Sequence, residues 1–153
     1  MIVVSDTSSV SALIRINHIH LLRDLYEDVR VPDAVAAELG HLHPSLPAWM
    51  KIEAVADRNS VDNLKKKLGA GESEAIVLSE EKHADLLLID DRRGRRIAME
   101  RGIHVIGLLA VLLEAKKQTK IISVREILER LEKETTFRIS VQLKESTIKK
   151  SGE

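Results

Sequence analysis

Residues 71–102 read GESEAIVLSEEKHADLLLIDDRRGRRIAMERG, a short apolar run between two segments of helical periodicity. The run Leu86 to Ile89 does not alternate polar and apolar residues, which is typical of a strand buried on both faces. Residues 71–83 before it and 92–101 after it are expected to be helices, and Gly102 ends the second. A buried strand between two helices predicts an α/β protein whose parallel sheet is covered on both faces.

The same alternation continues toward both ends of the chain. Apolar runs at Ile2 to Ser5, Val29 to Val31 and His104 to Ile106 are three more expected strands. Residues 41–50, which include two prolines, are expected to form a loop. Helical periodicity and capping residues predict helices over residues 8–16, 19–26, 32–39, 61–68, 108–116 and 124–134, and a frayed helix after Ser140.

We therefore expect an α/β fold: a three-layer sandwich with a short parallel sheet of about four or five strands. A length of 153 residues fits a single domain that spans residues 1–153. Within it, residues from about 123 to 150 are expected to form a C-terminal helical extension.

Composition excludes several classes of protein. The chain has no Cys, which excludes disulfide scaffolds, thiolate zinc sites, thiol nucleophiles and iron–sulfur clusters. Its 24 basic and 24 acidic residues give no net charge, so nothing favours a general polyanion binder. The aromatic residues are Tyr26, Trp49 and Phe137 alone, too few for an RNA-binding sheet on which several bases stack.

Neither membrane insertion nor export is expected. No apolar run approaches the roughly 20 residues that a membrane-spanning helix needs. The first residues, MIVVSD, have no basic segment and reach an acid at Asp6, unlike a signal peptide. We therefore expect a cytoplasmic protein.

Acidic residues directly follow two of the expected strands. Asp6 follows Ile2 to Ser5, and Asp90 and Asp91 follow Leu86 to Ile89. Parallel strands end at the same edge of their sheet, and ligands bind at that edge where the strand order reverses. The acids would therefore converge if the two strands are neighbours. The competing interpretation is that each Asp only caps the helix that follows it.

Two glutamates extend this acidic set. Glu38 shares a face of its expected helix with Val35, and Glu74 lies in the first turn of its helix. Val77 and Leu78 follow Glu74 at the spacing of one helical turn, so both acids border an apolar stripe. The competing interpretation, for either residue, is a carboxylate that is solvated or favoured by the helix dipole.

A fold that gathers several carboxylates needs an opposite charge beside them. Like charges a few ångströms apart raise one another's pKa and destabilise the fold. A hard divalent cation removes that cost, and Mg²⁺ or Mn²⁺ prefers oxygen ligands while keeping several waters for a phosphate substrate. Water activated by such an ion can attack phosphorus in line. The acids therefore predict metal-dependent hydrolysis of a phosphate ester.

Four segments, in this order, resemble the PIN domain: SDTSS at 5–9, VPDAVAAEL at 31–39, the stretch 69–102 and FRIS at 137–140. The likeness covers nearly the whole chain, which resembles small prokaryotic PIN proteins similar to VapC-type toxins. The resemblance implies a metal-dependent ribonuclease with a parallel sheet and a cluster of acids at its carboxyl edge. It also implies an RNA substrate, a toxin role, and a small antitoxin protein that inserts into the acidic groove.

The same resemblance assigns roles to individual acids. Asp6 would be the first-strand acid, Glu38 the acid of the early helix, and Glu74 the acid of the mid-chain helix, where most relatives carry Asp. Asp91 would close the fourth strand, with Asp90 as a second ligand. Together these acids would bind Mg²⁺ or Mn²⁺, and Asp6, Glu38, Glu74 and Asp91 would carry the catalysis.

Four side chains next to the acids are expected to contact the substrate. Thr7 and Ser8 match hydroxyl groups that help to hold the site in relatives. Arg92 and Arg93 follow the Asp pair directly, where guanidinium groups could grip RNA phosphates. For the arginines, the competing interpretation is a solvated helix face.

A homodimer is also expected. The apolar residues of segment 8–26 exceed what one helix face would bury, and PIN proteins often dimerise. The alternative is an ordinary core. The residues concerned are Val10, Leu13, Ile14, Leu21, Leu22 and Leu25.

Two other functions stay open on the sequence. The first is a catalytically weak RNA- or protein-binding module that keeps the fold. The second is a phosphatase of the haloacid dehalogenase type, which also carries an Asp after its first strand. The sequence speaks against the second, because Asp6-Thr7-Ser8 lacks another Asp two residues after the first.

Overall fold

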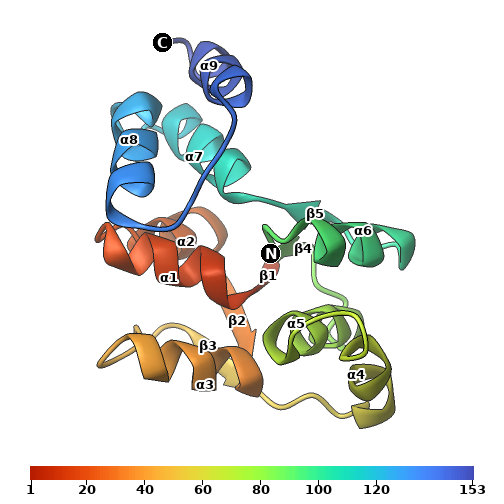
Figure 1. The fold of residues 1–153 in the computed structure, drawn as a ribbon. Helices are drawn as coiled ribbons and strands as arrows, with labels where there is room; N and C mark the ends of the chain where they lie inside the picture. Colours follow the sequence, from red (N-terminus) through yellow and green to blue (C-terminus); the bar gives the residue numbers. More distant parts are fainter.

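The computed structural model describes residues 1–153 and contains one sheet of five parallel strands (Figure 1). The order across the sheet is β3-β2-β1-β4-β5, and every neighbouring pair is parallel. The strands are β1 (Ile2–Ser5), β2 (Asp28–Pro32), β3 (Lys51–Glu53), β4 (Leu86–Leu88) and β5 (Val105–Ile106).

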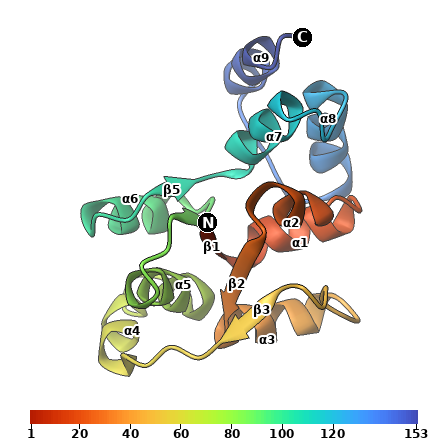
Figure 2. The same cartoon turned by 180° about the vertical axis from the view of Figure 1, so that it is seen from behind.

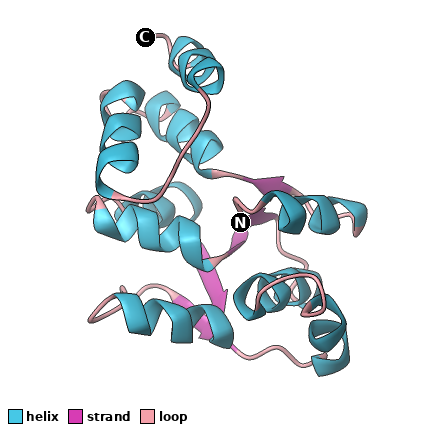
Figure 3. Cartoon of the chain, in the orientation of Figure 1, coloured by secondary structure: helices cyan, strands magenta, loops and turns pink.

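Nine helices connect the strands or follow the last one (Figure 3). They are α1 (Thr7–Arg15), α2 (His20–Tyr26), α3 (Asp33–Leu42), α4 (Arg58–Leu64), α5 (Ala70–Glu81), α6 (Arg92–Glu100), α7 (Leu108–Lys117), α8 (Val124–Glu134) and α9 (Val141–Lys150).

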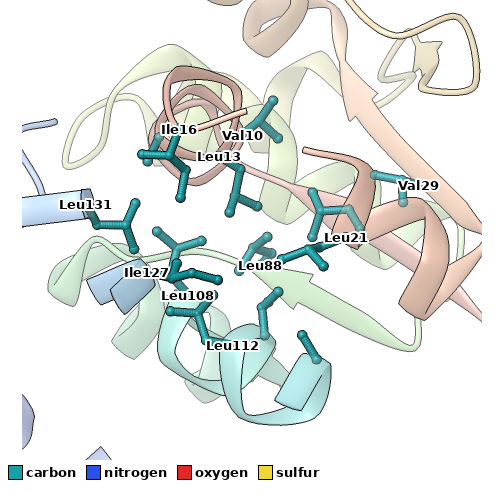
Figure 4. Close-up of a cluster of buried hydrophobic side chains, with 14 of the residues drawn as sticks. Val10, Leu13, Ile16, Leu21, Val29, Leu88, Leu108, Leu112, Ile127 and Leu131 are labelled. Atoms are coloured by element: carbon teal, nitrogen blue, oxygen red, sulfur yellow. The ribbon is translucent and has the colours of Figure 1, made fainter. Parts of the chain in front are cut away.

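Helices cover both faces of the sheet, which gives three layers (Figures 1 and 2). Successive residues of a strand point to opposite faces. Val3 of β1 therefore packs in one core cluster with side chains of α1, α2, α7 and α8, whereas Val4 packs in a second cluster with α4, α5 and α6. Figure 4 shows part of the first cluster, where Leu13, Leu88 and Leu112 are fully buried. The expected three-layer α/β sandwich is confirmed.

The strand order reverses between β1 and β4. The chain adds β2 and β3 on one side of β1, then crosses back and adds β4 and β5 on the other side. Ser5 at the end of β1 lies opposite Leu88 at the end of β4. The carboxyl ends of these two strands are therefore neighbours, and open α/β sheets bind ligands at such a point.

Some elements differ from the expected ones. The strand β3 follows the proline-rich loop, and it went unpredicted because it is three residues long, mostly exposed and without an apolar run. Pro32 ends β2 and precedes α3, which continues to Leu42 instead of ending at Leu39. The helix expected over 61–68 begins earlier, at Arg58, where Asp57 caps it, and ends at Leu64.

The apolar surplus of segment 8–26 packs within the chain. The side chains that suggested a dimer interface belong to the first core cluster, so the alternative of an ordinary core accounts for them. The homodimer stays a prediction without that support. Val10, Leu13, Leu21 and Leu22 are fully buried, and Ile14 and Leu25 are partly buried against the same cluster.

The last two helices, α8 and α9, begin at serine caps. Ser123 Oγ accepts from Glu126 N at 3.1 Å, and Ser140 Oγ accepts from Leu143 N at 3.1 Å. The loop between α8 and α9 runs back beside α1, which brings residues near the C-terminus to the carboxyl edge of the sheet (Figure 1). None of the helices combines the length and apolar character needed to cross a bilayer.

Candidate active site at the carboxyl edge of the sheet

A pocket of about 810 Å³ lies at the carboxyl ends of β1 and β4. Its walls come from one side of α1, from α3, from the start of α5, from the turn after β4, from the start of α7, and from the end of α8 with the loop after it. Acidic side chains dominate its polar lining. Six carboxylates take part: Asp6, Glu38, Glu72, Asp90, Asp91 and Glu134.

Asp6 links the ends of the two neighbouring strands. Its Oδ1 accepts from Ser9 N at 3.0 Å, which caps α1, and its Oδ2 accepts from Asp90 N at 3.1 Å. The residue is only 2% exposed. Burial, with a further contribution from the charge of Asp90, raises the pKa of Asp6 to about 6. A carboxyl group that ionises close to neutral pH in a pocket is typical of a functional site.

Asp90 and Asp91 both line the pocket but have different surroundings. Asp90 is half-buried, and its carboxylate accepts from Ser9 Oγ at 3.0 Å and from Leu108 N at 3.2 Å. Burial raises the pKa of Asp90. Asp91 is exposed, and its Oδ2 accepts from Gly94 N at 2.7 Å, which caps α6. The capping interpretation therefore holds for Asp91, and its place on the pocket wall holds as well.

Glu38 reaches from α3 toward the end of β1. Its Oε2 accepts from Thr7 Oγ1 at 2.5 Å, and its Oε1 accepts from Gly71 N at 3.1 Å. A Cβ at position 71 would lie 2.9 Å from Glu38 Oε1 and 3.1 Å from Thr7 Oγ1. A larger residue would push the Glu38 side chain aside, so Gly71 favours the arrangement in which the start of α5 donates directly to the glutamate.

Glu72, which the sequence reasoning did not select, lies on the pocket wall in the first turn of α5. Its side chain is half-buried. Burial raises the pKa of its carboxyl, and so do the negative charges of Asp91, Asp6 and Glu38. These three acids come from different elements and line the same pocket as Glu72, so the carboxylates face one shared space.

The structure does not place Glu74 in this pocket, which corrects the expectation from the sequence. Glu74 is 6% exposed, its Oε1 accepts from Ala34 N at 2.9 Å, and its Oε2 accepts from Arg58 Nη1 at 3.0 Å. The residue before α3 is Pro32, whose side chain offers no acceptor. Glu74 supplies that acceptor from α5, and its charge is favoured at a helix N-terminus. It therefore holds α3 and α5 together.

The sequence favours Glu74 over Glu72 because a position beside apolar residues indicates burial, which does not say whether the side chain points toward the pocket. Glu74 borders apolar residues, but α5 is buried around nearly its whole circumference from Ser73 to Ser79. The position of Glu74 beside an apolar stripe therefore indicates a side chain that points into the protein. The signal that indicates Glu72 is the glycine before it, since Gly71 stands where the helix start must approach another element closely.

The two expected hydroxyl residues line the pocket. Thr7 donates to Glu38, as described above, and Ser8 Oγ donates to Asp6 Oδ2 at 3.3 Å. Both hydroxyl groups therefore orient carboxylates of the pocket.

The two expected arginines lie outside the pocket lining. Arg92 and Arg93 are exposed in the first turn of α6, and Arg93 Nη1 donates to Lys67 O at 3.3 Å. The cationic side chain that does line the pocket is Arg15, at the end of α1, which the sequence reasoning did not single out.

The carboxylate oxygens of the pocket suit a hard divalent cation as ligands. Carboxylate oxygens are the ligands that Mg²⁺ and Mn²⁺ prefer, and the raised pKa values of Asp6 and Glu72 belong to carboxylates that lack an opposite charge. In the structure, however, no three acidic or histidine side chains are placed to bind one ion together. Their oxygens are instead held by protein donors such as Ser9 N. Completing a ligand shell would require these side chains to adjust.

The fold and the pocket define a class of protein: a three-layer α/β sandwich whose carboxylates converge where the strand order of a short parallel sheet reverses. A family model described as a PIN domain matches residues 2–153. The chain therefore belongs to the PIN-domain family, and the resemblance seen in the sequence is confirmed. PIN domains are generally nucleases, so this is a nuclease-type fold. No curated protein matches the chain.

Proposed function

We propose that the protein is a metal-dependent endoribonuclease that hydrolyses RNA phosphodiester bonds. The observation that carries this proposal is the convergence of carboxylates from four parts of a PIN-domain chain on one pocket. A polyanion would not enter such a pocket unless a cation offset the negative charge. A divalent ion between the acids and an RNA phosphate explains why the fold keeps these acids together.

The proposed ligands of Mg²⁺ or Mn²⁺ are five of the converging acids. When bound, such an ion offsets the charge that develops on the phosphate oxygens and makes a water easier to deprotonate. Glu72 takes the place first given to Glu74, because the carboxylate of Glu74 is bonded outside the pocket. The five are Asp6, Glu38, Glu72, Asp90 and Asp91.

The chain's own side chains would orient the acids and move protons. Thr7 fixes the direction of Glu38 and Ser9 fixes that of Asp90, since each hydroxyl donates to the carboxylate. Glu72 has a raised pKa, so its carboxylate suits accepting a proton from the attacking water and passing it on. Catalysis by proton transfer of this kind typically contributes about a hundredfold or more.

Contacts outside the pocket extend the proposal. Arg92 and Arg93 are exposed beside Asp91, at the rim, where they would contact phosphates that flank the cleaved bond. The toxin role, a small antitoxin that inserts into the acidic pocket, and the homodimer are proposed on the family resemblance alone.

A second candidate, a catalytically weak PIN-fold module that binds RNA or protein, is favoured by one observation. The carboxylates do not form a ready ligand shell in the structure. Purified protein incubated with labelled single-stranded RNAs separates the two candidates. The nuclease should cleave them in Mg²⁺ or Mn²⁺, and EDTA should stop the reaction. Binding of the same RNAs without cleavage in either metal would establish the module instead.

Metal binding should weaken as the pH falls through 6. Because the pKa of Asp6 is raised to about 6, roughly nine-tenths of the metal-free protein carries a proton there at pH 5. A metal ion competes with that proton, so the apparent affinity for Mn²⁺ should fall by about tenfold between pH 7.5 and pH 5.

The rise in melting temperature at a fixed Mn²⁺ concentration measures this affinity, and it should shrink at the lower pH. The stability of the metal-free protein should change with pH in the opposite direction, and should be greater at the lower pH as far as Asp6 is concerned. The folded pKa of Asp6 lies above its ordinary value of 3.8, so protonation of Asp6 stabilises the fold, and that gain is lost as the pH rises through 6. An equal Mn²⁺-induced rise at both pH values would contradict a role for Asp6 in metal binding.

A further inference from the structure

Arg15 is the one cationic side chain on the wall of a pocket that six carboxylates line. It forms none of the ion pairs found in the chain, and no side-chain hydrogen bond holds it. Because Arg15 pairs with none of the carboxylates that line the pocket, its guanidinium group is free to bind an anion from outside. Its planar guanidinium group suits a phosphate, to which it can donate two parallel hydrogen bonds.

The helix α1 sets the place of Arg15 relative to the acids. Ser8, Ser11, Ala12 and Arg15 line the pocket, and their spacing puts them on one face of the helix. Asp6 caps the N-terminus of the same helix. At 1.5 Å per residue, the backbone of Arg15 lies about 14 Å along the helix from that of Asp6, which leaves the two side chains several ångströms apart even if the arginine leans back toward the N-terminus. An anion held by Arg15 would therefore belong to a nucleotide beside the cleaved bond, and not to the cleaved phosphate.

Phe137 adds an aromatic surface to the same pocket. It lies in the loop between α8 and α9, packs partly against the first core cluster and is not fully buried. Phe137 N donates to Thr135 Oγ1 at 3.0 Å and Arg138 Nη1 donates to Phe137 O at 2.6 Å, so the backbone around Phe137 is bonded within the loop. Glu134, the acid of this wall, is paired with Arg130 at 2.7 Å. The aromatic ring therefore packs partly on the core and lies near an acid whose charge is offset by Arg130.

We infer that Arg15 and Phe137 bind one nucleotide that flanks the cleaved bond, with Arg15 on its phosphate and Phe137 stacked on its base. This inference rests on the proposed ribonuclease function and adds a substrate-binding subsite to it. A nucleotide has an anionic and an apolar aromatic part, and these two side chains offer a complement to each. Because a base within a duplex has no free face, the subsite selects single-stranded RNA.

Binding of a fluorescent single-stranded RNA, measured by anisotropy in Ca²⁺ with a gel to show that the RNA stays intact, tests the inference. Arg15→Gln should weaken binding about tenfold and reduce the slope of log affinity against log salt by about 0.7. Phe137→Leu, which keeps an apolar side chain but removes the aromatic face, should also weaken binding by about tenfold. Phe137→Tyr should restore it, and Arg125→Gln, outside the pocket, should have no effect.

A single abasic nucleotide, moved step by step along the RNA, separates stacking from a merely structural role of Phe137. At one position, the abasic nucleotide should weaken binding to the wild type. At that position, Phe137→Leu should bind the abasic RNA as well as it binds the intact RNA. If Phe137→Leu instead bound more weakly than the wild type by the same factor at every abasic position, the stacking contact would be overturned. If Arg15→Gln and Phe137→Leu both bound RNA as tightly as the wild type, the subsite would be overturned. Cleavage of RNA by the wild type would still support the nuclease in that case. The expected losses in a protein that never cleaves RNA would uphold the subsite and refute the nuclease.

Discussion

Replacing Asp6 by Asn should lower RNA cleavage in Mg²⁺ or Mn²⁺ by about a thousandfold or more. Asp6 is 2% exposed and bonded at the ends of both β1 and β4, so no neighbouring acid can take its place without moving a strand end. Loss of one ligand charge beside the reacting phosphate is worth several kcal/mol, and each 1.36 kcal/mol changes a rate about tenfold. The cleavage rate at saturating RNA and metal is the measurement.

The fold of the Asp6→Asn protein should survive. Asn keeps an oxygen for one donor, Ser9 N or Asp90 N, but turns an NH₂ group toward the other, at a cost of about 1–2 kcal/mol. Removal of a buried charge offsets this cost. Asp62→Asn, on the exposed side of α4, is the matched control and should cleave like the wild type. A folded Asp6→Asn protein that cleaves RNA at the wild-type rate would contradict the proposed site.

The sheet edge could be predicted from the sequence because the rule behind it is local. Any residue that directly follows a parallel strand lies at the carboxyl edge of the sheet. Asp6, Asp90 and Asp91 needed only one further condition, that their strands be neighbours, and the pairing of Ser5 with Leu88 meets it. The α/β class followed in the same way, since short unbroken apolar runs and helical segments alternate along the chain.

The side chains that the sequence missed are set by contacts between distant segments. On α5, both Glu72 and Glu74 fit a helix start, and only the position of α3 determines which acid is taken up as its N-terminal acceptor. Arg15 and Phe137 lie more than one hundred residues apart, and the loop after α8 brings them to one pocket. No periodicity within either segment predicts that these two residues line the same pocket.

Glu72→Ala and Glu74→Ala should have opposite effects, although one residue separates them in the chain. Glu72→Ala should lower cleavage by about a hundredfold, as the loss of a ligand or proton acceptor would. Its melting temperature should stay the same or rise, because burial and the charges of Asp91, Asp6 and Glu38 make its ionised carboxylate unfavourable. The cleavage rate and the melting temperature of the two variants, measured side by side, give the comparison.

Glu74→Ala should instead lower the melting temperature and spare catalysis. It leaves Ala34 N without its acceptor, which costs about 1–3 kcal/mol, and each kcal/mol lowers the melting temperature of a chain of this size by about 2–4 °C. Cleavage at 25 °C should stay within a few-fold of wild type. Glu74→Gln keeps an oxygen for Ala34 N and should regain most of the lost stability. If Glu74→Gln abolished cleavage while Glu72→Ala cleaved normally, the mid-chain acid of the site would be Glu74, and the carboxylate bonded to α3 would have to turn into the pocket when metal binds.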